Sequence, residues 1–215
     1  MLSVTTRMTE QQLRNALHAH LVASMAPDGR IVEELGVERG GARIDVAVIT
    51  DRLLGFEIKS DLDTFDRFAN QIHAYNRVFD EVTLVTGPAY VDDGVRLLPS
   101  WWGLMVAECK AGGVVQLREI RTAQRNPIQQ PLSIAMLLWK AEASEALARH
   151  LGRTVPTKWA SSKLHALLAE RVPLESLRQL VTRTLTAREA WRSPGTSGLD
   201  DGSSHPFATS IDCLM

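Results

Sequence analysis

The sequence predicts an α/β protein, in which a mixed sheet flanked by helices is followed by a C-terminal helical segment. Three observations support this fold class. A helical pattern over residues 9–25 precedes three β-branched runs between residues 31 and 59. A second helical pattern then leads to another apolar run that ends at residue 86. Helical patterns dominate from residue 127 onward. Strands that alternate with helices in this way are typical of a mixed α/β sheet.

The first helix is expected from Thr9, which forms a capping-box pattern with Gln12. A turn at residues 27–29 separates this helix from a strand over residues 31–37. A second strand carries Asp45, and a short turn at residues 50–52 connects it to a third strand that ends at Lys59. Gly55 lies within this third strand and predicts a bulge.

A helix is expected next over residues 64–79, with Asp63 as its cap. Its predicted core stripe consists of Phe65, Phe68, Ile72, Tyr75 and Phe79. A buried strand over residues 82–86 follows. Residues 102–108 and 114–120 predict a hairpin whose turn is the Ala-Gly-Gly sequence at 111–113.

The C-terminal part of the chain predicts three helices, over residues 133–151, 158–171 and 174–191. Gly152 is the expected terminator of the first of them. The Pro-, Gly- and Ser-rich stretch 193–215 is predicted to be disordered. The expected organisation is therefore a core domain over 1–125, a basic helical segment over 126–192 and a tail over 193–215.

Composition limits the classes of protein that fit. The chain has 215 residues, 45% of them apolar, and only two cysteines. It contains no apolar run long enough to span a membrane and no signal-peptide pattern at its start, so we expect a reduced, cytoplasmic protein.

Charge is distributed unevenly along the chain. Residues 1–120 carry 12 Lys and Arg against 17 Asp and Glu, whereas residues 121–192 carry 12 against 5. An acidic domain followed by a basic helical segment suits a protein that acts on nucleic acid. Solvated arginine-rich helices would give the same pattern.

Asp45, Glu57 and Lys59 form the most informative pattern in the chain. Side chains two positions apart on a strand share a face, so Glu57 and Lys59 point the same way and Ile58 points the other. The hairpin between the second and third strands brings Asp45 beside Glu57. Carboxylates among apolar residues need a partner, and a hard divalent cation is a natural one. A structural ion pair on a half-exposed sheet is the alternative.

Asp45 and the triplet Glu57-Ile58-Lys59 resemble the PD-(D/E)XK core of restriction-endonuclease-like phosphodiesterases, with Ile44 where the superfamily usually has proline. Gln71 on the following helix and the strand-like run over 81–86 extend the resemblance, which covers residues 10–120. More narrowly, residues 31–87 resemble a group of small, uncharacterised bacterial and phage proteins. The resemblance implies a restriction-endonuclease-like mixed sheet.

The resemblance also implies roles for individual residues. Asp45, Glu57 and the backbone carbonyl of Ile58 would bind Mg²⁺ or Mn²⁺, and Lys59 would orient the attacking water and stabilise the phosphate. Gln71 would bind a metal-bound water or a phosphate, although a surface glutamine fits its position equally. A further acidic residue is expected before the motif. Glu33 and Glu34 lie on opposite faces of a regular strand, and Glu34 is preferred.

The function implied is a metal-dependent nuclease whose favoured substrate is DNA, with a homodimer as one possible assembly. The alternative is a catalytically inactive nucleic-acid-binding or interaction protein that keeps the nuclease fold. The sequence leaves open the choice between DNA and RNA, and the mode of cleavage.

Overall fold

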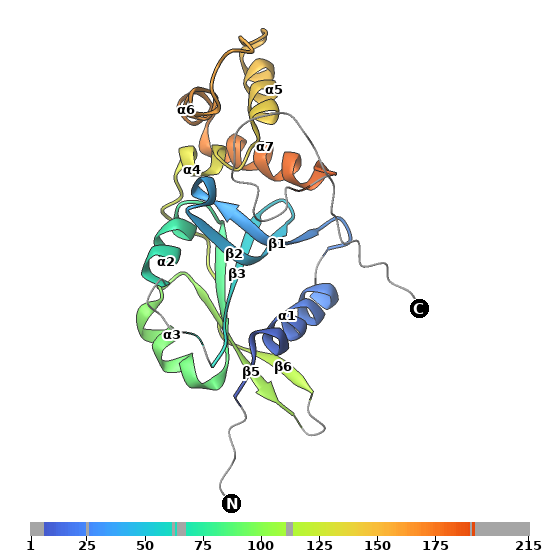
Figure 1. Cartoon of the computed structure of the whole chain (residues 1–215), viewed down its shortest axis with the longest axis vertical. Helices are drawn as coiled ribbons and strands as arrows, with labels where there is room; N and C mark the ends of the chain where they lie inside the picture. The colour runs from blue at the N-terminus through green and yellow to red at the C-terminus, as the bar shows by residue number, and fades with distance from the viewer. Residues whose placement is uncertain are drawn as a thin grey trace, which may run out of the picture.

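A six-stranded mixed sheet forms the centre of the computed structural model, which describes residues 7–24, 26–61, 63, 68–110, 114–189 and 191. Its strands lie side by side in the order in which they occur in the sequence (Figure 1). They are β1 (Arg30–Val37), β2 (Ala42–Ile49), β3 (Leu53–Lys59), β4 (Glu81–Thr86), β5 (Gly103–Cys109) and β6 (Val115–Arg121). The neighbours β1–β2, β2–β3 and β5–β6 pair antiparallel, and β3–β4 and β4–β5 pair parallel. The predicted mixed α/β class is confirmed.

Helix α1 (Glu10–Ser24) covers one face of this sheet, because Leu13, Leu17 and Leu21 are buried against it. Their apolar partners on the sheet include Phe56 and Ile58 of β3. Thr9 and Gln12 form the expected cap through side-chain and backbone hydrogen bonds. The helical spacing of three leucines thus places α1 on the sheet.

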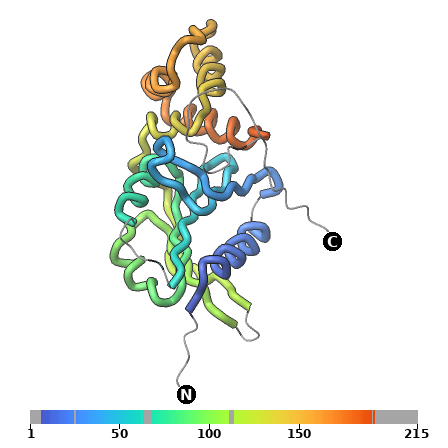
Figure 2. Tube along the Cα trace, in the orientation of Figure 1, coloured from blue at the N-terminus to red at the C-terminus, as the bar shows by residue number. Residues whose placement is uncertain are grey.

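The remaining helices share one apolar core with the opposite face of the sheet. They are α2 (Phe68–Asn76), α3 (Val91–Leu97), α4 (Pro131–Ala135), α5 (Lys140–Leu151), α6 (Ser161–Arg171) and α7 (Leu174–Ala187). Two 3₁₀ turns, η1 (Glu38–Gly40) and η2 (Pro88–Tyr90), complete the described elements. Figure 2 shows the C-terminal helices gathered at the end of the molecule away from β5 and β6. The C-terminal helical segment is confirmed, and the domain boundary near residue 125 stays a prediction.

The helix expected over residues 133–151 is in fact two helices, α4 and α5, so that prediction was wrong. Trp139 adopts an extended conformation (φ −68°, ψ 161°) and is the N-cap of α5. Its N–H donates to the Glu142 carboxylate at 2.7 Å. A tertiary contact holds this break, because the guanidinium of buried Arg188 binds both oxygens of Glu142 at 2.6 and 2.9 Å. The Arg188 guanidinium also lies 4.0 Å from the Trp139 ring centroid and 4.6 Å from that of Trp191.

Other boundaries differ from the expectation in smaller ways. Helix α2 is described from Phe68 to Asn76, and residues 64–67 lie outside the described residues. Helix α6 begins three residues later than expected and α7 ends four residues earlier. Gly152 terminates α5 in the left-handed conformation, as predicted. The short elements η2 and α3 were not predicted, and the predicted disordered tail lies outside the described residues.

Gly55 does not form the expected bulge, because its register with β2 and β4 is regular. Glycine is needed at this position because there is no room for a side chain. A Cβ atom at this position would lie 2.5 Å from Ile44 Cδ1 and 3.1 Å from the Phe79 ring. The glycine therefore lets an isoleucine and a phenylalanine close over the centre of the sheet.

Candidate functional site: a carboxylate–lysine cluster on the sheet

Strand β3 presents Glu57 and Lys59 to the α2 side of the sheet, while Ile58 between them packs with the leucines of α1. The Lys59 ammonium lies 2.9 Å from Glu57 Oε1. The side chain of Glu57 is only 1% exposed, and that of Lys59 is 14% exposed. The alternation expected from the sequence is present, and it places an ion pair at the margin of the core.

Helix α2 supplies two further hydrogen bonds to the same carboxylate. Gln71 Nε2 donates to Glu57 Oε1 at 2.7 Å, and the Tyr75 hydroxyl donates to Glu57 Oε2 at 2.9 Å. The Tyr75 hydroxyl also lies 2.5 Å from the carbonyl oxygen of Arg43. Burial raises the pKa of Tyr75, as does the charge of Glu57, so Tyr75 stays protonated. One face of α2 thus holds the Glu57 carboxylate in a fixed orientation.

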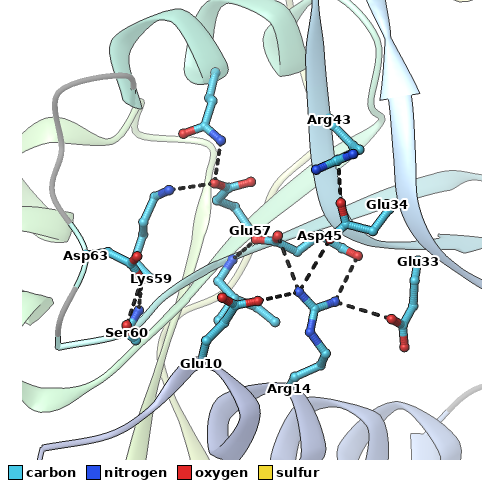
Figure 3. A network of polar contacts seen from close by, with 12 residues as sticks. Glu10, Arg14, Glu33, Glu34, Arg43, Asp45, Glu57, Lys59, Ser60 and Asp63 are labelled. Atoms are coloured by element: carbon cyan, nitrogen blue, oxygen red, sulfur yellow. Dashed lines mark hydrogen bonds and ion pairs between the residues drawn. The ribbon is translucent and has the colours of Figure 1, made fainter. Parts of the chain in front are cut away.

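Asp45 lies beside this carboxylate, between it and α1 (Figure 3). Its Oδ2 atom accepts the backbone N–H of Ile58 at 2.7 Å. Its Oδ1 atom faces the guanidinium of Arg14, at 3.5 Å from Nη2. Burial raises the pKa of Asp45, while the hydrogen bond from Ile58 and the charge of Arg14 act in the opposite direction. Each oxygen of Asp45 therefore contacts a different part of the site.

The Glu57 carboxylate has a pKa raised to about 7. Burial is the largest cause, and the charge of Asp45 adds to it. Lys59 and Tyr75 lower this pKa but do not offset the burial. The two carboxylates therefore compete for the positive charge near them, and an added cation would relieve that competition.

Glu33 and Glu34 both reach the site, which corrects the expectation that only one of them would. Glu34 has a positive φ of 56°, so the alternation of β1 is interrupted there. As a result, Arg14 contacts Glu33 Oε2 at 3.5 Å and Glu34 Oε1 at 3.6 Å. A non-glycine residue in the left-handed region is uncommon and often lies at a functional site. Glu34 also pairs with Arg43, and Glu33 also pairs with His18.

Arg14 and Tyr75 are members of the cluster that the sequence reasoning did not find. Tyr75 was assigned to the core, and it is indeed fully buried, but its hydroxyl binds Glu57. Its signal was available, because Tyr75 lies four residues after Gln71 and on the same face of a helix. Arg14 follows Leu13 of the apolar stripe and gave no comparable signal.

The carboxylates of the cluster make it a candidate site for a divalent metal. Among the described residues, no three His, Cys, Asp or Glu side chains are arranged so that they hold a metal by themselves. Mg²⁺, however, is commonly held by one or two carboxylates together with water and substrate phosphate. Five carboxylates surround the cluster, and three guanidinium or ammonium groups face them. The carboxylates are Glu10, Glu33, Glu34, Asp45 and Glu57, and the basic groups are Arg14, Arg43 and Lys59.

The fold and this cluster define a mixed α/β protein with a carboxylate–lysine site on its sheet. The chain belongs to the Bacteriophage P4 protein cII family, whose model matches residues 3–193. It is similar to protein cII of Enterobacteria phage P4, with 25% identity over 189 residues that cover 84% of this chain and 68% of that protein. A solved structure of a protein of unknown function from Silicibacter pomeroyi has a TM-score of 0.45 and 22% identity, covering 66% of this chain and 90% of that one.

Family membership confirms the expected similarity to phage proteins. The assignment to the restriction-endonuclease-like superfamily stays a prediction. Within the residues that the structure describes, no helix has both the length and the apolar character needed to cross a membrane.

Proposed function

We propose that this protein hydrolyses phosphodiester bonds of nucleic acid with the help of a divalent metal ion, and that DNA in the cytoplasm is its substrate. One observation carries the proposal. Asp45 and Glu57 lie side by side on adjacent strands, and Lys59 contacts Glu57 at 2.9 Å. Two carboxylates and an ammonium at one point of a sheet supply the charges that such hydrolysis needs.

Asp45 and Glu57 would hold Mg²⁺ or Mn²⁺, with the backbone carbonyl of Ile58 as a further proposed ligand. When bound, the metal would lower the pKa of a water molecule and polarise a phosphoryl oxygen. The raised pKa of Glu57, at about 7, supports this assignment, because a nearby cation would favour its ionised form.

The neighbouring side chains would position the reacting groups. Lys59 would orient the attacking water and stabilise charge on the phosphate, while Gln71 keeps the Glu57 carboxylate in place through its 2.7 Å hydrogen bond. Tyr75 holds the other oxygen of that carboxylate. Glu34 would shape the acidic side of the site through Arg14 and Arg43.

Basic residues of the C-terminal helices would contact the phosphate backbone. Lys158, Lys163 and Arg183 have exposed side chains and suit this role. Arg178 suits it less, because its side chain is only 13% exposed and pairs with Asp80 and Glu175. A homodimer would present two sites to the two strands of a duplex.

Incubation of the purified protein with linear, circular and single-stranded DNA and with RNA tests the proposal. Cleavage should require Mg²⁺ or Mn²⁺ and should stop when the metal is chelated. Lys59→Ala should reduce the cleavage rate by about 100-fold or more, because charge stabilisation at the phosphate is lost. Lys110→Ala is the matched control, since Lys110 is an exposed lysine of the β5–β6 hairpin that pairs with Glu108. Equal rates for wild type and Lys59→Ala would contradict a catalytic Lys59.

One observation favours the alternative of an inactive nucleic-acid-binding protein with this fold. The Arg14 guanidinium already lies among four carboxylates of the site, where it supplies positive charge without a metal. Binding of DNA that is equally tight with and without metal, in the absence of any cleavage, would support this alternative.

A further inference from the structure

Arg14 holds a central position in the acidic half of the site (Figure 3). Its side chain is 12% exposed and extends from α1 toward the sheet. Its Nη2 atom lies 2.7 Å from Glu10 Oε1, 3.5 Å from Asp45 Oδ1 and 3.6 Å from Glu34 Oε1. A single guanidinium therefore contacts carboxylates from α1, β1 and β2.

The contacts of Arg14 differ in length. The bond to Glu10 is short, and Glu10 is exposed and lies one turn away on the same helix. The contacts to the Asp45 side chain, to the Asp45 backbone carbonyl, and to Glu33 and Glu34 are all longer, at 3.4 to 3.6 Å. Hydrogen bonds weaken as donor and acceptor move apart beyond about 3.2 Å. Arg14 can thus leave the site while it keeps its strongest partner.

Asp45 has one oxygen that a new ligand can take. Its Oδ2 atom is bound by the N–H of Ile58, which belongs to the backbone of a buried strand. Among the described residues, Arg14 is the partner of its Oδ1 atom. A cation that binds Asp45 through Oδ1 must therefore share that oxygen with a guanidinium or displace it.

We propose that Arg14 is an exchangeable internal cation, which neutralises Asp45 in the metal-free protein and moves away from Asp45 toward Glu10 when a divalent cation binds. The inference rests on the proposed metal site. The guanidinium and the metal are both positively charged and would both contact Asp45 Oδ1, so each weakens the binding of the other. Arg14 therefore lowers the affinity for metal. In the metal-free protein, it also reduces the repulsion among the acidic residues.

Calorimetric titration with MnCl₂ tests the exchange in wild type, Arg14→Gln and Arg14→Lys. Removal of the competing charge should raise Mn²⁺ affinity by about tenfold or more in Arg14→Gln. Arg14→Lys should change affinity less, because it keeps the charge. Arg43→Gln is the matched control, since it removes one positive charge from the same network through Glu34 only. Its affinity should stay within about threefold of wild type.

A second measurement uses the wild-type protein and does not depend on the folding of a variant. The Nε–H resonance of Arg14, assigned by its absence in Arg14→Lys, should shift when Mg²⁺ is added and its exchange with water should accelerate. An unchanged resonance at saturating Mg²⁺ would overturn the inference.

The outcomes separate this inference from the proposed function. Equal or weaker Mn²⁺ affinity in Arg14→Gln, with clear binding by wild type, would reject the exchange and leave the metal site standing. Absence of Mn²⁺ binding in both proteins would reject the metal site, and the exchange with it. Equal gains in Arg14→Gln and Arg43→Gln would indicate a general charge effect and would also reject the exchange.

Discussion

At the scale of single residues, Glu57 dominates the electrostatics of the site. An ionised carboxylate that is 1% exposed is costly unless it is paired and hydrogen-bonded. Three donors from β3 and α2 bind it, and its pKa is still raised to about 7. The protein therefore keeps a carboxylate here at the expense of stability, which is common where a charged group serves a function.

The raised pKa of Glu57 predicts how stability varies with pH. Between its ordinary value of 4.5 and about 7, the folded protein holds a proton that the unfolded chain has lost. The free energy of unfolding should therefore fall as pH rises through this window, by at most about 1.4 kcal/mol per pH unit from this group. Urea denaturation without divalent ions, from pH 4 to pH 8, measures the slope.

Glu57→Gln should flatten this slope, because its amide does not titrate. Glu145→Gln, at an exposed position of α5, is the control and should keep the wild-type slope. Curves of equal slope for wild type and Glu57→Gln would show that Glu57 titrates normally. The raised pKa of Asp45 also makes the free energy of unfolding fall as pH rises, both in wild type and in Glu57→Gln.

The sequence predicted part of this site, and the limits have a physical cause. Asp45, Glu57 and Lys59 follow from strand alternation and a short hairpin, which are local properties, whereas Gln71 came from the resemblance to the nuclease superfamily. The joint participation of Glu33 and Glu34 depends on one backbone angle at Glu34, which no local pattern indicates. Arg14 reaches the site only because α1 packs on the sheet face beside it, and that packing is tertiary.

At the scale of elements, long-range contacts decide where helices break. The strands were predicted to within one or two residues at most ends, because their apolar runs are short and bounded by turns. The single helix expected over residues 133–151 was divided because Arg188 binds Glu142 and lies against Trp139. Helical spacing within residues 133–151 carries no information about an arginine that lies 37 residues beyond that range.

Substitution of Arg188 tests this account of the break between α4 and α5. Arg188→Lys keeps the charge but loses the two-pronged contact with Glu142 and the flat stacking between Trp139 and Trp191. We expect a loss of about 2–3 kcal/mol in the free energy of unfolding, measured by urea denaturation. Arg149→Lys, at an exposed position of α5, should change it by less than about 0.5 kcal/mol. A loss for Arg188→Lys no larger than that of the control would contradict the tertiary origin of the break.

At the scale of the whole molecule, charge separates the acidic sheet from the basic helices. Between Glu145 and Glu170 the chain carries four Lys and Arg residues and no Asp or Glu. This stretch includes the end of α5 and most of α6, which lie together at one end of the molecule (Figure 1). Lys163 also lies 4.1 Å from the ring centroid of Trp159. A basic surface of this kind suits contact with phosphates that an acidic site repels.

Charge reversal measures the contribution of exposed basic residues in the C-terminal part of the chain to nucleic-acid binding. The triple variant Lys158→Glu/Lys163→Glu/Arg183→Glu should bind a fluorescent DNA duplex at least about tenfold more weakly, and the slope of affinity against salt should fall by about three. Fluorescence anisotropy in the presence of a chelator measures binding without cleavage. The control variant Arg96→Glu/Arg118→Glu reverses exposed residues of α3 and β6. Identical salt slopes for wild type and the triple variant would exclude these helices from phosphate contact.

The strict agreement between strand order and sequence order has a consequence for how the chain folds. The antiparallel pairs β1–β2, β2–β3 and β5–β6 close over short connections, so little chain entropy is lost when each of them forms. Pairs that close over short connections form faster than the parallel pairs, whose partners lie farther apart in the sequence. The hairpin of β2 and β3, joined by three residues, is the natural place for folding to begin. The two strands that carry Asp45 and Glu57 would then be among the first parts of the protein to reach their final pairing.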